Sequence, residues 1–233
     1  MSNASPSSFD AARSKTYDDR IEHMIPGYTT MHRLTEVFLS TELPETASIL
    51  MVGAGTGAEV VECGTRHPGW TLTAVDPSSE MVKLGRQKTD DKGLSSRVHW
   101  HDISLKNLTM EEPFDAATLL LVLHFLPDDG GKSALLEHIA ERLKPGAPLV
   151  LSTFVGDPAN TRTKKIYELS KANAIANGLD RAEVEDKLNL NRKDIHLVPE
   201  ERIKALLRDS GFIDAQRIVQ GLAMMTWIAR TNR

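Results

Sequence analysis

Apolar residues recur along the chain in short runs that alternate with stretches of helical spacing. Seven runs after residue 48 are strand candidates, and runs such as 116–121 have the continuous apolar character of strands that are buried on both faces. These runs are 49–52, 71–75, 98–101, 116–121, 149–154, 213–218 and 224–229, and helical spacing appears between them at about 57–67, 79–89, 131–143 and 199–210. Such alternation predicts an α/β protein with a doubly wound, largely parallel sheet.

Two segments do not follow this alternation. Residues 17–40 have helical spacing that is interrupted by Pro26 and Gly27, which predicts two short helices with a bend. Residues 158–192 are helical in pattern, polar, and lie between the fifth and sixth strands. We therefore expect one domain over residues 17–233, with 17–40 as a helical cap and 158–192 as a helical insertion.

Composition and charge exclude several classes of protein. The 233 residues are 40% hydrophobic and 26% charged, with a net charge of -4 and no dense basic block, so we expect no nucleic-acid partner. No apolar run approaches the roughly 20 residues of a membrane helix. Residues 1–16 are rich in Ser, Asn and Pro and lack a secretory signal, which predicts a disordered tail on a cytoplasmic protein. The single cysteine, Cys63, excludes an intrachain disulfide, and we expect it in the core.

Three glycines at alternate positions follow the first strand. Gly53, Gly55 and Gly57 lie between a buried strand and a helix that begins near Ala58. Glycine is required where a chain turns sharply and where the backbone contacts a ligand without a Cβ in the way. The motif alone leaves two alternatives open: it also satisfies the dinucleotide fingerprint G-x-G-x-x-A, and a tight turn of this kind can exist without a ligand.

An acidic residue at the end of the second strand narrows these alternatives. Asp76 lies 19 residues after the last glycine of the turn. In a βαβ unit this separation places its carboxylate beside the turn, where it can accept both hydrogen bonds of a ribose diol. We expect Ser78 or Ser79 to cap the following helix, with Met81 in its first turn. The simpler alternative is that Asp76 is only a turn residue before Pro77.

Two weaker signals follow in the order that this fold requires. Asp102 and Ile103 come directly after the third strand, where a carboxylate can reach an exocyclic amine and an apolar side chain can cover a purine ring. Lys144, Pro145 and Gly146 form a turn signal that leads into the fifth strand. Each signal is weak alone, but their order strengthens the prediction of a nucleoside-binding site.

Taken together, these motifs resemble those of class I methyltransferases dependent on S-adenosylmethionine (SAM), over roughly residues 47–155. The resemblance implies a Rossmann-like fold with seven strands, the last antiparallel, and SAM as the cofactor. It implies that the glycine turn faces the methionine part of SAM, that Asp76 holds the ribose and that Asp102 meets the adenine. One departure is Met51, which stands where many members have an acidic residue under the turn.

Segments outside these motifs are similar to carboxy-SAM synthases of the tRNA wobble-uridine pathway. The segment 17–28, the residues 124–127 and the strand 221–229 carry this similarity, and its Pro-Gly-Tyr tyrosine points to Tyr28 as a cofactor contact. The resemblance also implies a homodimer. The full set of expected cofactor-binding residues is Tyr28, Gly53, Ala54, Gly55, Gly57, Asp76, Pro77, Met81, Asp102 and Ile103.

Two positions argue against a carboxy-SAM synthase. The asparagine that serves the modified cofactor in that family is replaced by Leu120. The arginine that holds the added carboxylate has no clear counterpart, since its place falls near Lys187 or Leu188 without a gap, and at Arg192 only with one. Without a cation the carboxylate would lose its charge-assisted partner. We therefore favour O- or N-methylation of a small-molecule acceptor, with the synthase-like activity as the alternative.

Methyl transfer requires alignment of the acceptor and exclusion of water more than it requires reactive side chains. His124 follows the fourth strand at the edge where ligands bind in doubly wound sheets, which makes it the candidate general base. Helices over 17–40 are expected to cover the site, so His23 and His32 are candidates for substrate contact. No spacing typical of a metal site is present, so we expect no metal.

Two other functions remain as alternatives. Tyr167 and Lys171 have the spacing of the catalytic pair of short-chain NAD(P)-dependent dehydrogenases, although the glycine pattern of that family is absent. Because Tyr167 follows Lys164 and Lys165, we expect it on a solvated helix face. A non-catalytic SAM-binding protein is the second alternative, since Met51 lacks the acid and no catalytic set is evident.

Overall fold

A computed structural model describes residues 20–109 and 112–232 of the chain. The expected tail over residues 1–16 and the start of the cap at Tyr17 lie outside the described residues. The strands of the described part are β1 (Ala47–Val52), β2 (Trp70–Val75), β3 (Val98–His101), β4 (Ala116–Leu120), β5 (Pro148–Phe154), β6 (Phe212–Gly221) and β7 (Met224–Thr231). Each of the seven predicted strands is therefore confirmed, with its ends within three residues.

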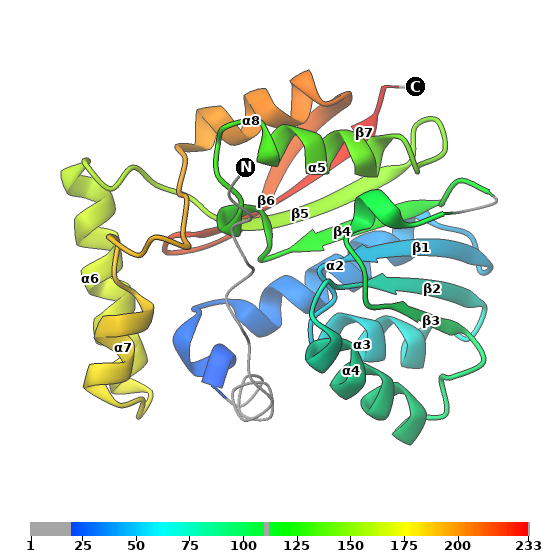
Figure 1. Ribbon diagram of the computed structural model, residues 1–233, viewed down its shortest axis with the longest axis horizontal. Helices are drawn as coiled ribbons and strands as arrows, with labels where there is room; N and C mark the ends of the chain where they lie inside the picture. The colour runs from blue at the N-terminus through cyan, green and yellow to red at the C-terminus, as the bar shows by residue number, and fades with distance from the viewer. Residues whose placement is uncertain (1–19, 110–111, 233) are drawn as a thin grey trace.

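The seven strands form one sheet in the order β3-β2-β1-β4-β5-β7-β6 (Figure 1). Neighbours from β3 to β5 pair in parallel, and β7 is antiparallel to both β5 and β6. This order reverses direction between β1 and β4, so the carboxyl ends of these two strands flank the crevice where open α/β sheets bind ligands. The predicted doubly wound fold with an antiparallel last strand is confirmed.

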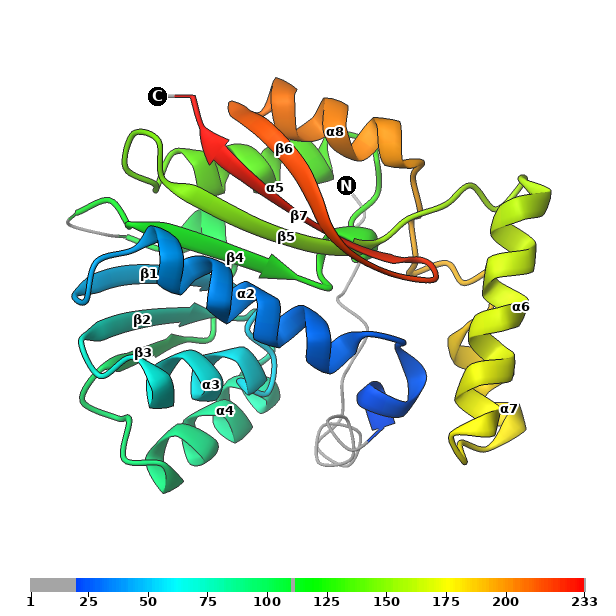
Figure 2. The same cartoon turned by 180° about the vertical axis from the view of Figure 1, so that it is seen from behind.

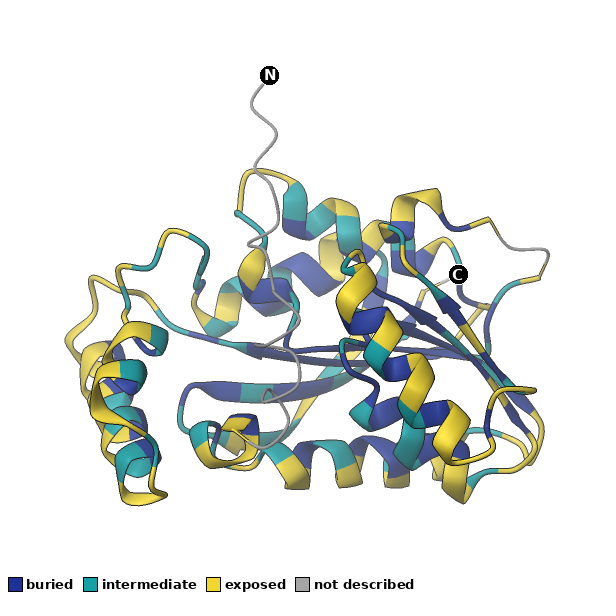
Figure 3. Cartoon of the chain, turned by 60° about the horizontal axis from the view of Figure 1, so that its bottom comes forward, coloured by how far each residue is buried: buried dark blue, intermediate teal, exposed yellow. Residues whose placement is uncertain are grey.

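Helices cover both faces of the sheet (Figures 1 and 2). The helices α2 (Tyr28–Glu42), α3 (Ala58–Arg66) and α4 (Ser79–Asp91) share one apolar cluster with Ile49 and Met51 of β1. The helices α5 (Gly131–Ala140) and α8 (Glu200–Asp209) share the opposite cluster with Leu50 and Val52. Alternate residues of β1 thus point to opposite faces, and both faces are buried (Figure 3). This double burial explains why the strand is a continuous apolar run.

The N-terminal cap bends where Pro26 and Gly27 predict it. Residues 20–24 are helical, and α2 begins after Gly27, whose φ of +86° lies in the left-handed region that favours glycine. The bend lies against the β6–β7 hairpin, because a Cβ on Gly221 would come within 1.8 Å of the carbonyl oxygen of Pro26. The second helix ends at Glu42, two residues beyond the expected end of the cap segment.

The predicted helical insertion forms α6 (Thr161–Ala176) and α7 (Arg181–Lys187), which stand beyond the carboxyl ends of the parallel strands (Figures 1 and 2). Side chains of Asn160 and Asp180 cap the two helices by accepting backbone N–H groups. An ion pair of 2.8 Å joins Arg20 of the N-terminal cap to Glu183 of α7. The insertion and the cap therefore meet over the edge of the sheet where ligands bind in this fold class.

Candidate functional site

The glycine turn after β1 holds three glycines in the left-handed region. The φ angles of Gly53, Gly55 and Gly57 are +67°, +52° and +81°. A Cβ on Gly53 would approach Val122 Cγ2 to 2.2 Å, and one on Gly57 would approach Trp100 to 3.0 Å. At Gly55, by contrast, a Cβ would meet no atom within 4 Å. Packing inside the protein therefore explains two of the glycines, whereas Gly55 borders open space.

Asp76 lies beside this turn, as its sequence separation predicts. One carboxylate oxygen accepts the backbone N–H of Gly55 and the other accepts that of Ser78, both at 2.9 Å. Burial raises the pKa of Asp76, and the two N–H bonds oppose that rise. A carboxylate has about four lone-pair sites, so Asp76 retains acceptor capacity for a ribose diol.

The residues after Asp76 start α4. Pro77 is exposed in the connection, and Ser78 is the N-cap, with its hydroxyl oxygen accepting the backbone N–H of Met81 at 3.4 Å. Met81 is buried in the first turn of the helix. The expectation that a serine caps this helix is confirmed at Ser78.

Asp102 and Ile103 follow β3 at the same edge of the sheet. The backbone N–H of Asp76 donates to the carbonyl oxygen of His101 at 3.1 Å, which holds the ends of β2 and β3 together. Asp102 is exposed, and Ile103 is half-buried against the apolar core. Asp102 and Ile103 are therefore near the end of β2, at the edge of the sheet where Asp76 also lies.

A small cavity of about 50 Å³ adjoins the glycine turn. Tyr28 and His32, one helical turn apart on α2, form part of its wall with an edge-to-face ring contact of 4.5 Å. Glu59 of α3 also lines it, although the sequence analysis did not single out this residue. The signal for Glu59 is its place on the buried stripe of α3, where a carboxylate is unusual. The remaining lining residues are Met31, Gly53, Ala54, Gly55, Thr56, Ala58, Leu120 and Leu121.

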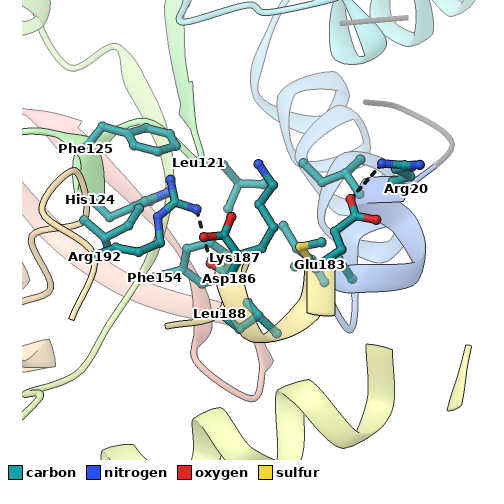
Figure 4. A pocket seen from close by; sticks show the side chains of 14 residues that line it. Arg20, Leu121, His124, Phe125, Phe154, Glu183, Asp186, Lys187, Leu188 and Arg192 are labelled. Carbon is teal, nitrogen blue, oxygen red and sulfur yellow. Dashed lines mark hydrogen bonds and ion pairs between the residues drawn. The ribbon is translucent and has the colours of Figure 1, made fainter. Parts of the chain in front are cut away.

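A larger cavity of about 380 Å³ lies between the N-terminal cap, α7 and the ends of β4 and β5 (Figure 4). Its volume falls within the range of roughly 300–1,000 Å³ that is typical of small-molecule sites. Its lining is apolar around His124, with charged side chains from the cap and the insertion. The lining residues are Arg20, Ile21, Met24, Ile25, Leu121, His124, Phe125, Phe154, Glu183, Asp186, Lys187, Leu188, Arg192 and Ile195.

Leu121 lines both cavities and therefore marks the place where they adjoin. Its φ of +59° is unfavourable for a side chain with a Cβ and costs about 1–2 kcal/mol. A hydrogen bond of 2.8 Å from its backbone N–H to the carbonyl oxygen of Ser152 holds this conformation. Strained residues of this type concentrate at functional sites.

His124 is buried at the inner end of the larger cavity. Burial, the Lys132 ammonium and the Arg192 guanidinium lower its pKa to about 3, so the imidazole is neutral at pH 7. The Thr153 hydroxyl contacts the carbonyl oxygen of Phe154 at 3.4 Å and His124 Nδ1 at 3.2 Å. In the tautomer with its proton on Nδ1, His124 donates to this hydroxyl and carries its lone pair on Nε2.

The segment that contains the glycine turn matches a known protein family. A sequence model described as a methyltransferase domain matches residues 50–149, which include Gly53, Asp76 and Asp102. The chain contains a methyltransferase domain, and its fold is that of the class I SAM-dependent methyltransferases. The buried carboxylate of Asp76, the open position at Gly55 and the buried polar groups of the small cavity fit SAM, which is the cofactor of this family.

Curated relatives of this methyltransferase include two kinds of enzyme. The carboxy-SAM synthase of Cronobacter sakazakii is 26% identical over 207 residues, covering 88% of this chain and 83% of that protein. The ubiquinone biosynthesis O-methyltransferase of Xanthomonas euvesicatoria is 31% identical over 134 residues, covering 55% of this chain and 54% of that protein. The chain therefore matches the first along most of its length and spans about half of the second.

Solved structures share the fold. The 1,6-didemethyltoxoflavin-N1-methyltransferase of Burkholderia thailandensis has a TM-score of 0.61 at 22% identity, covering 94% of this chain and 85% of that chain. An O-methyltransferase family protein from the same organism has a TM-score of 0.64 at 18% identity, covering 96% of this chain. This methyltransferase spans 60% of that longer chain.

The dehydrogenase-like pair is not a catalytic pair in this methyltransferase, and the expected exposure of Tyr167 is wrong. Tyr167 is buried in the cluster between α6 and α7, and burial raises its pKa. The Lys171 ammonium instead forms ion pairs with Glu168 and Glu185 at 2.9 and 2.8 Å. The sequence did not indicate this burial because the inward stripe of α6 has no strong hydrophobic pattern, and its other members are Thr163, Ser170 and Ala174.

The positions at which the sequence differs from the carboxy-SAM synthases line both cavities. Leu120 lines the small cavity where the resemblance expects an asparagine. Lys187, Leu188 and Arg192 all line the larger cavity. The Arg192 guanidinium forms a two-point ion pair with Asp194, donating from Nε at 2.8 Å and also from Nη2. The positive charge of Arg192 is therefore balanced by the Asp194 carboxylate.

Two further features are absent from residues 20–109 and 112–232. No group of three or more His, Cys, Asp or Glu side chains in these ranges has a geometry that would hold a metal ion. No helix in the same ranges has the length and apolar character needed to cross a membrane. Cys63 is buried, as the sequence predicts.

Proposed function

We propose that this enzyme transfers the methyl group of SAM to the oxygen or nitrogen of a small-molecule acceptor bound in the larger cavity. The observation that carries the proposal is the contact between the two cavities at Leu121. A cofactor in the cavity at the glycine turn and an acceptor in the larger cavity would meet there. The structural relative from Burkholderia thailandensis, which contains both 1,6-didemethyltoxoflavin and S-adenosylhomocysteine, supports a small-molecule acceptor.

Different residues of the chain would bind different parts of the cofactor. Asp76 would hold the ribose hydroxyls, and Asp102 with Ile103 would bind the adenine. The glycine turn, Ala54 and Tyr28 would surround the methionine part, with Pro77 and Met81 supporting the start of α4. When bound, SAM supplies a methyl group that its sulfonium already makes electrophilic, so the protein contributes alignment and exclusion of water.

His124 would position the acceptor rather than take its proton in the ground state. A general base works best with a pKa near the working pH, and the pKa of His124 is lowered to about 3. Its Nε2 lone pair can nevertheless accept a hydrogen bond from an acceptor N–H or O–H in the cavity. That bond would orient the acceptor lone pair toward the methyl group near Leu121.

The apolar wall and the mixed charges define the acceptor class. Phe125 and Phe154 favour a flat or apolar body, since aromatic side chains stack on such molecules. Lys187 and Arg20 are balanced by Glu183 and Asp186 in the same wall, so a polyanion is disfavoured. We propose a cytoplasmic single-domain enzyme, and a homodimer whose mass can be checked by light scattering.

Mass spectrometry tests the proposed reaction. The purified enzyme is incubated with SAM and a panel of aromatic amines, phenols and heterocycles, and products are screened for the mass of one added methyl group. We expect a methylated product in at least one reaction and none with Asp76→Ala. Absence of any methylated product, together with no conversion of SAM to S-adenosylhomocysteine in cell extract, would contradict the proposal.

A carboxy-SAM synthase-like activity is the second candidate. It is favoured by the match over 83% of the Cronobacter sakazakii synthase and by the presence of Lys187 and Arg192 in the larger cavity. The ion pair of Arg192 with Asp194 argues against it, because the guanidinium already has a carboxylate partner. The mass of the ligand that copurifies with the enzyme distinguishes the candidates, since carboxy-SAM has a higher mass than SAM.

A further inference from the structure

Two buried side chains beside the glycine turn carry polar atoms that make no hydrogen bonds among the residues that the structure describes. Both ring nitrogens of His32 are buried and lack partners, and so is one carboxylate oxygen of Glu59. His32 comes from α2 and Glu59 from α3, yet both line the same small cavity. The site therefore contains an imidazole and a carboxylate that a single ligand could contact.

Unpartnered polar atoms of this kind are rare in folded proteins, because each costs about 1–3 kcal/mol when it is removed from water. Burial lowers the pKa of His32 to about 4 and raises that of Glu59 to about 7, which shows how poorly the surrounding protein stabilises their charged forms. A ligand that brings its own donors and acceptors would remove this cost. The geometry thus indicates polar ligand groups in the small cavity.

Glu59 also accounts for the missing acid at Met51. The residue paired with Met51 on the neighbouring strand is Thr118, whose hydroxyl donates to Glu59 at 3.0 Å. The carboxylate of Glu59 therefore lies over the strand ends where many family members carry their acid. Its second oxygen is the unpartnered one. In this chain, α3 supplies the carboxyl group that β1 lacks.

We propose that Glu59 binds the α-ammonium group of SAM and that His32 donates a hydrogen bond to its α-carboxylate. This assignment rests on the proposed binding of SAM, and neither residue belongs to the glycine turn or to the ribose contact. An amino-acid tail carries one cation and one anion, which match one carboxylate and one N–H donor. Asp76 remains available for the ribose on the other side of Gly55.

Two ligands that differ in the amino-acid tail test this assignment. S-Adenosylhomocysteine carries the α-ammonium and α-carboxylate groups, whereas 5′-methylthioadenosine has the same nucleoside and thioether without them. Both are titrated calorimetrically into wild-type protein, Glu59→Gln and His32→Phe. A charge-assisted hydrogen bond contributes about 1.5–3 kcal/mol, so we expect each variant to bind S-adenosylhomocysteine about tenfold or more weakly. Affinity for 5′-methylthioadenosine should stay within about twofold.

Controls separate loss of the contact from loss of the fold. Glu62→Gln changes an acid on the same helix that pairs with Arg66 at the surface, and it should leave both affinities unchanged. His32→Asn keeps an N–H donor and should recover part of the loss seen with His32→Phe. Thermal unfolding of each variant checks that the protein is folded at the titration temperature.

The outcomes also separate this inference from the proposed function. Equal loss for both ligands, or no loss for either, in folded variants would overturn the role of Glu59 and His32 while leaving SAM binding intact. Wild-type protein that binds neither ligand would overturn SAM binding itself and the inference with it.

Discussion

The two cavities that adjoin at Leu121 are built in different ways. The small cavity is formed at the ends of parallel strands by backbone held in fixed conformations and by buried polar groups such as His32 and Glu59, and Asp76 accepts the backbone N–H of Gly55 in its wall. The larger one is walled by helices from two segments outside the sheet, with apolar and exposed charged side chains. A rigid site suits a constant cofactor, and helical walls can vary with the acceptor on the same scaffold.

Removal of the Asp76 carboxylate should have the largest effect on the cofactor cavity. Two hydrogen bonds from ribose hydroxyls to a charged acceptor contribute about 4 kcal/mol together, since each contributes about 1.5–3 kcal/mol. We expect Asp76→Ala to weaken S-adenosylhomocysteine binding about 1,000-fold in calorimetric titration. Glu62→Gln serves as the control, and affinity within threefold of wild type for folded Asp76→Ala would contradict the ribose contact.

The burial of Glu59 should make stability depend on pH. Burial disfavours the carboxylate and raises the pKa of Glu59 from its ordinary value of 4.5 in the unfolded chain to about 7 in the folded protein. The contribution is full below about pH 4.5 and is lost as pH rises through about 7, a difference of about 3 kcal/mol. Denaturant unfolding at pH 5 and pH 8 should show this loss for wild type relative to Glu59→Gln. Identical pH dependence of the two proteins would be evidence against a buried, uncompensated carboxyl.

A change in the acceptor cavity should leave the cofactor cavity unaffected. Phe125 lines the larger cavity and is 38% exposed, so its removal should not disturb the core. Loss of its apolar contact costs about 1–2 kcal/mol, so we expect Phe125→Ala to raise the KM for the acceptor about tenfold. Titration should show unchanged affinity for S-adenosylhomocysteine. A parallel loss of cofactor affinity would mean that the two cavities are not separate binding sites.

The ion pair between the cap and the insertion should have the smallest effect. Arg20 and Glu183 are 2.8 Å apart, with side chains 50% and 22% exposed, and such pairs contribute about 0.2–1 kcal/mol. We expect Arg20→Ala to raise hydrogen exchange in α7 by about two- to fivefold. Arg217→Ala breaks a similar surface pair with Glu200 and should not change α7. No change in α7 with Arg20→Ala would show that the pair does not hold the wall of the cavity.

Most of the fold could be predicted from local patterns in the sequence. Continuous apolar runs predicted β1, β4 and β5 because these strands are covered on both faces. Pro26 with Gly27 predicted the bend because glycine permits its positive φ. The separation between the glycine turn and Asp76 predicted their proximity, since consecutive parallel strands end at the same edge. These features depend on neighbours in sequence or on one repeated unit.

Features that depend on packing between distant segments were not predictable in the same way. Tyr167 is buried on a stripe of Thr, Ser and Ala residues, so its helix has no hydrophobic pattern to indicate the inward face. Glu59 and His32 come together only because α2 and α3 pack side by side. The sequence placed Arg192 only with a gap, whereas the fold of the insertion brings it to the cavity wall.

Hydrogen–deuterium exchange with and without S-adenosylhomocysteine tests the division between the two cavities most directly. Cofactor binding at the glycine turn predicts slower exchange in peptides that cover residues 53–59 and 76–81, where the ligand would contact the turn and the start of α4. It predicts little change in α6 and α7. Protection confined to α6 and α7, with none at the glycine turn, would contradict the account.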